Sequence, residues 1–192
     1  MTTTAPDQAA FLRERLHDFD EIRRDIRAVV ADLSPDEMRR RPADGGWSIA
    51  EVLAHLVASD SDYVPKIRAL LDRAHTVGPR ADGRPWRASF FGKFLVRSLD
   101  PSNTRKMPAP KRWRPAAGAR PAAEASDYLR VLDEVAELAR KAEGLDLGGI
   151  KLASPVSPLI RMNLGDGFLL LATHARRHLG QMRRVRAEVA RR

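Results

Sequence analysis

The sequence predicts an all-α protein that folds as a four-helix bundle with a long irregular connection between its second and third long helices. Four stretches place apolar residues three or four apart, and no stretch of comparable length alternates like a strand. Seven of the thirteen prolines fall between residues 72 and 123, which favours irregular structure there. Four amphipathic helices that each need a partner face make a bundle the economical architecture.

The first long helix is expected over residues 8–33, where apolar residues recur every third or fourth position. Ser34 and Pro35, followed by two acids, then resemble the start of a new helix, with an N-cap residue and a proline in the first turn. This second helix is expected to be a short turn, because Pro42 and two glycines follow closely.

The second long helix is expected to begin at Ser48, since Glu51 three residues later completes a capping box. Its apolar stripe continues through Val52 and Leu56 toward Leu70. Pro65 interrupts the stripe, because a proline inside a helix removes a hydrogen bond. We therefore expect the helix to bend at Pro65 or to end early.

The connection over residues 72–123 carries the net charge of the whole chain. The sequence has a formal charge of +9, and residues 72–121 hold twelve cations against three acids. The remaining residues are therefore balanced in charge. A short helix is expected over residues 86–99, and a connection of this length is typically functional or mobile.

The third long helix is expected over residues 124–143, with Gly144 as its stop. Residues 148–158 are expected to be a loop, with no credible strand anywhere in the chain. The fourth long helix is expected to begin near Asn163, where Asn163 and Asp166 imitate a capping box, and to run to about Ala190.

Length and composition limit the classes of protein that fit. A chain of 192 residues suits a single domain, 1–192, and the absence of cysteine excludes disulfide scaffolds, thiolate metal sites and cysteine nucleophiles. The first twenty residues lack the apolar core of a signal peptide, and no apolar run is long enough to span a bilayer. We expect a cytoplasmic protein with no membrane partner.

Three of the five histidines are expected near the interior of the bundle. His174 and His178 lie four residues apart, so on a helix they share a face, and that face borders the apolar stripe. His55 falls on the inward side of the second long helix. Three neutral imidazoles form a ligand set for zinc, nickel, iron or copper, with open positions left for water or substrate. The alternative is a set of hydrogen-bonded core histidines.

Other chemical motifs are weak or absent. His17 and His75 have no companion at ligand spacing and are expected at the surface. The His-Glu-x-x-His motif and the di-iron pairing are missing, and no glycine-rich phosphate loop follows a strand. Arg176 and Arg177 flank the histidine pair, where they could contact an anionic substrate or simply face solvent.

Four blocks of the sequence together resemble a known family. Residues 46–56 read GWSIAEVLAHL, with Asp60 beyond them, and residues 174–181 read HARRHLGQ. Between them lie the proline-rich residues 106–110, followed by Trp113, and the NLGD run at residues 163–166. The order and content of these blocks are similar to those of the DinB-like (YfiT-like) superfamily, over most of the chain.

The resemblance implies a bundle of up-down-down-up topology and one divalent metal ion, such as Zn, Ni, Fe or Mn, on His55, His174 and His178. It also implies that Gln181 supports one of the metal-binding histidines or packs beside it and, in many members, a homodimer. Some members are transferases that use a low-molecular-weight thiol, and others have no established activity. The possible contact of Arg177 with substrate comes from its position beside His178 and not from the resemblance.

Three hypotheses for function follow from the sequence. The first is a metal-dependent thiol transferase or hydrolase that acts on a small electrophilic substrate. The second is a stress-response accessory protein that binds nucleic acid through the basic 72–121 segment, with its aromatic residues against bases. We prefer packing of these aromatic residues on the bundle, and so do not expect a nucleic-acid partner. The third is a metal-binding member without catalysis.

Overall fold

The computed structural model describes residues 7–103, 108–115 and 121–189. Nearly all regular structure is helical, as predicted, and a two-stranded sheet is added to it. Among the described residues no helix is both long and apolar enough to cross a membrane. The elements are α1 (Gln8–Val30), α2 (Pro35–Arg39), α3 (Ile49–Ser61), α4 (Val64–Val77), α5 (Phe90–Leu99), the 3-10 turn η1 (Lys111–Trp113), α6 (Pro121–Lys141), β1 (Lys151–Ala153), β2 (Arg161–Asn163) and α7 (Leu164–Val189).

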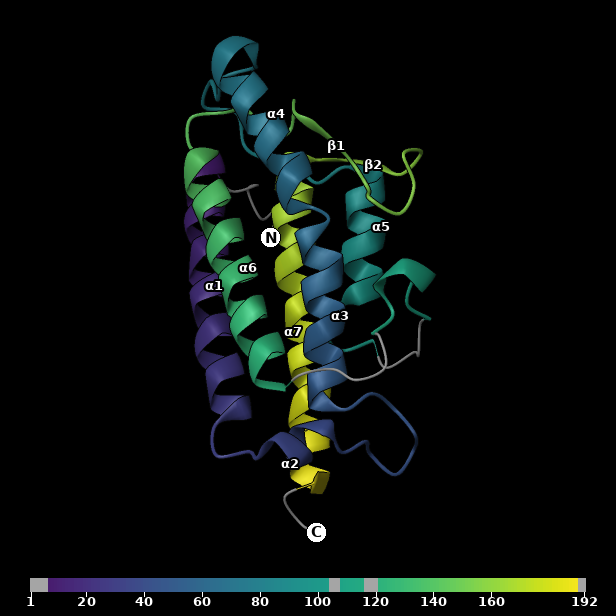
Figure 1. Ribbon diagram of the computed structural model, residues 1–192. Coiled ribbons are helices and arrows are strands. Elements are labelled where there is room, and N and C mark those ends of the chain that lie inside the picture. Colours follow the sequence, from purple (N-terminus) through teal and green to yellow (C-terminus); the bar gives the residue numbers. More distant parts are fainter. Residues whose placement is uncertain (1–6, 104–107, 116–120, 190–192) are drawn as a thin grey trace, which may run out of the picture.

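Four long helices form the bundle, in a closed ring of contacts. α1 packs against α6 and α7, and α3 packs against the same two helices from the other side. In Figure 1, α3 and α6 run upward while α1 and α7 run downward. Burial of large apolar side chains between the four helices supplies the core. Its fully buried members include Phe11, Phe19, Ile26, Leu53, Leu56, Tyr128, Leu132 and Phe168.

The N-terminus of α3 is fixed by the predicted capping box. The Ser48 hydroxyl accepts a hydrogen bond from the Glu51 amide at 3.2 Å, and the Glu51 carboxylate accepts one from the Ser48 amide at 2.9 Å. The helix ends at Ser61, before Pro65, and Pro65 lies in the first turn of α4. The prediction of an early end is therefore confirmed, because proline is tolerated only where its missing amide is not needed.

A second reciprocal cap begins α7, as predicted. The Asn163 side-chain oxygen accepts from the Asp166 amide at 2.8 Å, and Asp166 accepts from the Asn163 amide at 3.0 Å. Asp166 is fully buried and also accepts from the amide of Ser89, so the same cap anchors the start of α5. At the end of α6, Gly144 takes the left-handed conformation, with φ of +76°, that favours glycine.

The expectation of a loop without strands over residues 148–158 is wrong in part. β1 and β2 form an antiparallel pair in which Leu152 lies opposite Met162, and both side chains are buried against the helices. Each strand has three residues, which is too short for an alternating pattern to be recognised in the sequence. The pair positions Asn163, the cap of α7, at the end of β2.

The connection between α4 and α6 packs only partly as predicted. The indole of Trp86 is buried and stacks on Phe11 at 4.1 Å between ring centroids, and Trp113 is buried as well. The helix expected over residues 86–99 begins later, at Phe90. Its three phenylalanines do not pack on the bundle as we expected, because they point outward. Arg105, Lys106, Met107 and Arg120 of the basic and proline-rich predictions lie outside the described residues.

Candidate metal centre

The three predicted histidines meet inside the bundle, between α3 and α7. Each offers a ring nitrogen, and the three nitrogens lie within 4.8 Å of one another. Nε2 of His55 is 3.3 Å from Nε2 of His174, and the ring centroids of His174 and His178 are 4.7 Å apart. The i,i+4 pair on α7 and the single histidine on the facing helix therefore form one cluster.

The other ring nitrogen of each histidine is occupied by an oxygen. Nδ1 of His55 lies 2.8 Å from the backbone carbonyl of Trp113, and Nδ1 of His174 lies 3.3 Å from Oδ1 of Asp60. Nδ1 of His178 lies 3.0 Å from the side-chain oxygen of Gln181. Because all three oxygens can only accept a hydrogen bond at these positions, the proton of each neutral ring belongs on Nδ1.

With the proton on Nδ1, Nε2 of each ring keeps its lone pair, in a cluster whose ligand nitrogens lie within 4.8 Å of one another. Such lone pairs on neutral imidazoles are the donors that divalent transition metals prefer. Metal-binding histidines usually donate their other N–H to a carboxylate, a carbonyl or a similar oxygen, which is the pattern seen at all three rings. The residues present therefore fit a divalent ion bound by three histidines.

Burial keeps two of the rings uncharged. Desolvation, reinforced by the neighbouring His174, lowers the pKa of His55 from its usual 6.5 to about 4. Desolvation, with His174 and His55 nearby, lowers the pKa of His178 well below its usual value. Both rings are consequently neutral at pH 7, and no proton has to leave before their Nε2 atoms bind a cation.

Asp60 is the most buried acid near the cluster and has a full set of partners. Its side chain is 2% exposed, and Oδ1 accepts from the Ser59 hydroxyl at 2.8 Å in addition to its contact with His174. Oδ2 accepts from the phenol of Tyr128, on α6, at 3.1 Å. Burial and Asp60 raise the pKa of Tyr128 well above its usual value, so the phenol stays a donor. Asp60 thus connects α6 to the histidine cluster.

Most of these supporting contacts have no recognisable signal in the sequence. Asp60 is noticeable only as an acid following the first block, and Tyr128 only as a member of an apolar stripe. Gln181 was predicted beside the ligands, and it does lie against His178. The carbonyl of Trp113 carries no residue-type information at all, because any residue would supply the same backbone oxygen.

Two side-chain contacts hold the carbonyl of Trp113 in place over α3. The Trp113 indole donates to Oδ2 of Asp62 at 2.6 Å, and Arg112 forms an ion pair with the same carboxylate at 2.9 Å. These contacts attach the η1 turn to the end of α3. The ring of Trp47 also packs near His55, with 5.0 Å between the ring centroids. Two tryptophan-bearing segments therefore contact the imidazole of His55.

The two arginines beside the histidine pair have different surroundings. Arg176 forms ion pairs with Asp18 at 2.5 Å and Glu21 at 3.0 Å, and so links α7 to α1. Arg177 donates to the carbonyl of Asp100 at 3.2 Å, and its charge helps to lower the pKa of His178. Contact between Arg177 and a substrate stays a prediction.

The two remaining histidines are exposed, as predicted. His17 lies beside Glu21 on α1, and Nε2 of His75 lies 2.7 Å from the carbonyl of Lys141.

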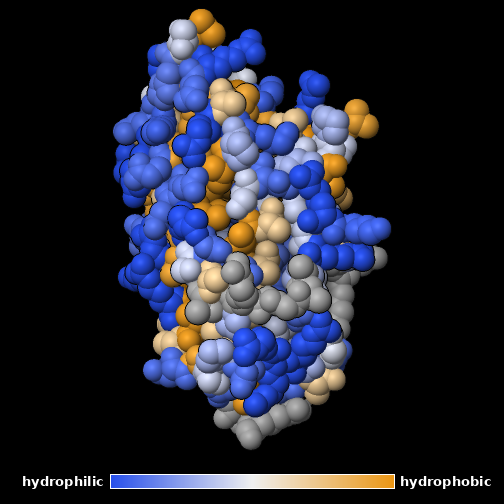
Figure 2. Space-filling view, viewed as in Figure 1, coloured by the Kyte–Doolittle hydropathy of each residue, from blue (hydrophilic) through white to orange (hydrophobic). Residues whose placement is uncertain are grey.

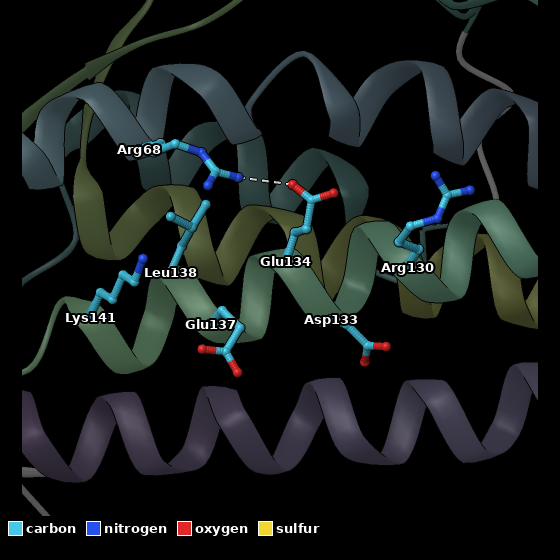
Figure 3. Close-up of a pocket in the computed structure, with 7 residues that line it drawn as sticks. All are labelled: Arg68, Arg130, Asp133, Glu134, Glu137, Leu138 and Lys141. Atoms are coloured by element: carbon cyan, nitrogen blue, oxygen red, sulfur yellow. Dashed lines mark hydrogen bonds and ion pairs between the residues drawn. The ribbon is translucent and has the colours of Figure 1, made fainter.

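A surface groove of about 270 Å³ lies elsewhere, on α4 and α6 (Figure 3). Its lining is mainly charged, and Figure 3 shows Arg68 and Glu134 facing each other across it, with an ion pair of 2.9 Å. Asp133 pairs with Arg23 at 2.5 Å. The charges that line the groove are thus largely matched, and no histidine of the cluster takes part.

Comparison with known proteins identifies one family. A family model described as the DinB superfamily matches residues 18–182, a range that contains all three clustered histidines and their oxygen partners. A search of curated proteins and a search of solved structures each found no match.

Proposed function

The chain belongs to the DinB superfamily, and from this we propose that it binds one divalent metal ion through Nε2 of His55, His174 and His178. The single observation that carries the proposal is the hydrogen bonding of the clustered rings. Each Nδ1 is held by an oxygen acceptor, which leaves Nε2 of each ring with a free lone pair, and the ligand nitrogens of the cluster lie within 4.8 Å of one another. Core histidines that served only packing would have no reason to leave three ring nitrogens without an oxygen partner at one point.

We propose further that the centre is catalytic. Three protein ligands leave coordination positions open, and a divalent ion held there would supply Lewis-acid activation of a bound thiol or water. The chain contributes the scaffold for this chemistry: Asp60 orients His174, Gln181 orients His178, and the η1 turn orients His55. The activity that fits is transfer of a low-molecular-weight thiol to a small electrophile, or hydrolysis of such a substrate.

The composition favours a thiol that arrives from outside. With no cysteine in the chain, the protein itself cannot supply the nucleophilic sulfur. The cationic connection lies near the centre through the η1 turn, and it would attract a cosubstrate or substrate that carries carboxylates. A histidine-only centre thus suits a reaction in which both the nucleophile and the electrophile are small molecules.

Metal content tests the first part of the proposal. Purified protein is analysed for zinc, nickel, iron and manganese, and we expect about one ion per chain when the three-histidine site is filled. The His174→Ala variant is expected to lose the ion, whereas His75→Ala, at an exposed histidine outside the cluster, is expected to keep it. Wild-type protein that takes up none of these ions on dialysis would refute the metal centre.

Activity tests the second part separately. The metal-loaded protein is incubated with small electrophiles and with a panel of low-molecular-weight thiols, and with water alone. Turnover that needs a thiol and disappears in His174→Ala would support a transferase, and turnover without a thiol would support a hydrolase. Protein that binds its metal but turns over no substrate, with or without a thiol, would favour a metal-binding protein without catalysis.

A further inference from the structure

One face of α5 exposes aromatic side chains to solvent. Phe90 is 81% exposed, Phe94 is 63% exposed and Phe91 is 43% exposed. Phe90 and Phe94 are four residues apart, so they lie on one stripe of the helix. Large apolar side chains gathered in this way are characteristic of a surface that docks on something apolar.

The outward direction of the phenylalanines is fixed by the other face of α5. Gly92 is buried against the carboxyl group of Asp166, and a Cβ at Gly92 would lie 2.1 Å from the nearest carboxyl atom. Leu95, Val96 and Leu99 pack on the core from the same side. The helix has therefore used its inner face to bind α7, and its aromatic stripe has no place in the bundle.

The aromatic face is surrounded by positive charge. Residues 87–97 contain three cations and no acid. Lys93 and Arg97 lie on the exposed side of α5, three residues beyond Phe90 and Phe94, and neither forms an ion pair with any described residue. The surface thus combines exposed aromatic rings with uncompensated cations.

The turn between β1 and β2 extends the apolar part of this surface. Leu159 is 84% exposed and Val156 is 44% exposed, and α5 contacts β2, which begins two residues after Leu159. Along the right margin of Figure 2, where α5 and this turn lie, orange and blue surfaces alternate. The docking face therefore consists of α5 and the β1–β2 turn.

We propose that this docking face binds the surface of an anionic lipid membrane, with Phe90 and Phe94 entering the interface between headgroups and acyl chains. An amphipathic helix with aromatic residues on one side and Lys or Arg beside them lies in the plane of such an interface. Anionic headgroups complement the cations, and the acyl boundary accepts rings and aliphatic side chains alike. A ten-residue helix, about 15 Å long, needs no spanning segment.

Two other occupants fit the same face less well. Single-stranded nucleic acid would stack bases on the rings, but Leu159 and Val156 offer no surface for stacking. A second copy of the chain would bring the same cations together across a two-fold axis, which costs energy because like charges repel. The expectation of no membrane partner rested on the lack of a spanning segment, and a helix that lies on the surface does not need one.

Vesicle flotation tests the proposal and requires no bound metal. Full-length protein is mixed with vesicles of phosphatidylcholine alone, or with about one third phosphatidylglycerol. We expect flotation with the anionic vesicles and much less with the neutral ones, and we expect added salt to weaken it. The Phe90→Ser/Phe94→Ser variant is expected to stay in solution. Val77→Ser, at a valine 75% exposed on α4, is the matched control and should float like wild type.

A charge-reversal pair separates lipid insertion from simple charge attraction. Lys93→Glu/Arg97→Glu is expected to weaken binding by at least about fivefold per residue, whereas Arg24→Glu/Lys66→Glu, which also reverses two exposed cations, is expected to have a smaller effect. The proposal would be overturned if Phe90→Ser/Phe94→Ser floats with anionic vesicles as wild type does. It would also be overturned if wild type stays in solution with anionic vesicles at low salt. Tight binding of an oligothymidine, or self-association that Phe90→Ser/Phe94→Ser abolishes, with no flotation, would assign the face to another occupant.

Discussion

Each histidine of the candidate metal centre is held by a different kind of acceptor. Gln181 lies on the same helix as His178, one turn further on, so that contact depends on α7 alone. The contacts of His55 with the carbonyl of Trp113 and of His174 with Asp60 join separate elements. The orientation of these two rings is therefore set by tertiary structure. A change in either partner should alter the position or the basicity of Nε2 in the ring that it holds.

The Asp60→Asn substitution is expected to weaken metal binding by about 10- to 100-fold. The amide can still accept from His174, but it lacks the negative charge that strengthens the hydrogen bond and the basicity of the ring. Competition between the protein and a chromophoric zinc chelator would measure the change in dissociation constant. Asp36→Asn, at an exposed acid on α2, is the control, and an equal affinity in Asp60→Asn and wild type would contradict this account.

The Tyr128→Phe substitution is expected to lower the free energy of unfolding by about 1–3 kcal/mol at pH 7. It removes the hydroxyl that donates to Oδ2 of Asp60, and a buried carboxylate oxygen is left without that partner. Urea denaturation with a tryptophan fluorescence readout would measure the loss. A loss below about 0.5 kcal/mol would show that the phenol does not support Asp60.

The pH dependence of the same variant follows from the raised pKa of Tyr128. Above pH of about 10 the phenol ionises in the unfolded chain but not in the folded protein, so wild type loses stability as pH rises. Tyr128→Phe has no phenol at this position and lacks this loss. The difference in the free energy of unfolding between wild type and Tyr128→Phe should therefore narrow above that pH. A constant difference across this range would contradict the shift.

At the scale of single residues, the sequence predicts the clustered histidines better than it predicts the residues that support them. His174 and His178 could be found because a spacing of four on a helix brings two rings together whatever the rest of the fold does. Asp60 and His174 are separated by 114 positions, and His55 and Trp113 by 58. Contacts of that separation depend on how helices pack, and no local pattern encodes them.

Helix ends of this protein were predictable because capping is local chemistry. Ser48 and Glu51, and likewise Asn163 and Asp166, satisfy each other's backbone amides within one turn. These two caps begin the two helices that carry the histidines. The positions of the ligands along the bundle therefore follow from four residues that a single-sequence analysis can recognise.

The Ser48→Ala substitution is expected to cost about 1 kcal/mol of stability, because the Glu51 amide loses its acceptor at a buried helix start. Ser34→Ala is the matched control, since Ser34 caps the five-residue α2 with the same motif at an exposed position. Its loss should be smaller. Urea denaturation would measure the midpoints of the two variants, which are comparable when the free energy of unfolding has the same slope against urea concentration in both. Equal losses of stability in Ser48→Ala and Ser34→Ala would mean that burial adds nothing to the cap.

The Gly92→Ala substitution is expected to destabilise the protein by about 1–3 kcal/mol. The added methyl would lie within 2.4 Å of the Asp166 carboxyl atoms, so α5 would have to move away from α7. Gly180→Ala on α7 is the control, because its nearest neighbour would be an arginine nitrogen at 3.7 Å. That variant should gain up to about 1 kcal/mol from helix propensity. Thermal unfolding that is unchanged in Gly92→Ala would contradict the close approach.

The buried side of α5, the helix that carries the exposed phenylalanines, cannot be predicted from the pattern of its apolar residues. Apolar residues at positions 90, 91, 94, 95, 96 and 99 extend around most of α5, so periodicity does not say which side faces the bundle. The side was decided by Gly92, which allows the backbone to approach Asp166. A glycine at that position is visible in the sequence, but its partner on α7 is 74 residues away.

The whole molecule separates two kinds of chemistry. The bundle helices carry balanced charge and hold the three clustered histidines, whereas the connection between α4 and α6 holds the net charge of +9. Within this connection, the η1 turn contacts His55, whereas α5 presents its phenylalanines to solvent. The homodimer that the family resemblance implies stays a prediction. If α5 docks on lipid, the faces of the bundle remain open for that dimer.

Binding of a divalent ion is expected to stabilise the whole chain, because the ligands come from two helices and are aligned only in the folded state. At a free ion concentration 100 times the dissociation constant, the gain is about 2.7 kcal/mol. For a chain of this length that corresponds to a rise of about 5–10 °C in Tm. Calorimetry of wild type after chelation and after addition of zinc would measure the rise.

Two variants assign this stabilisation to the centre. His174→Ala should show no rise with zinc, because a site with two histidines binds the ion much more weakly. The Tm of His75→Ala should rise as much as that of wild type, since the His75 ring lies outside the cluster and its hydrogen-bond partner is the carbonyl of Lys141. The same rise in all three proteins would place the bound zinc elsewhere on the surface. The converging Nε2 atoms would then have to be explained by packing alone, with their lone pairs left to water.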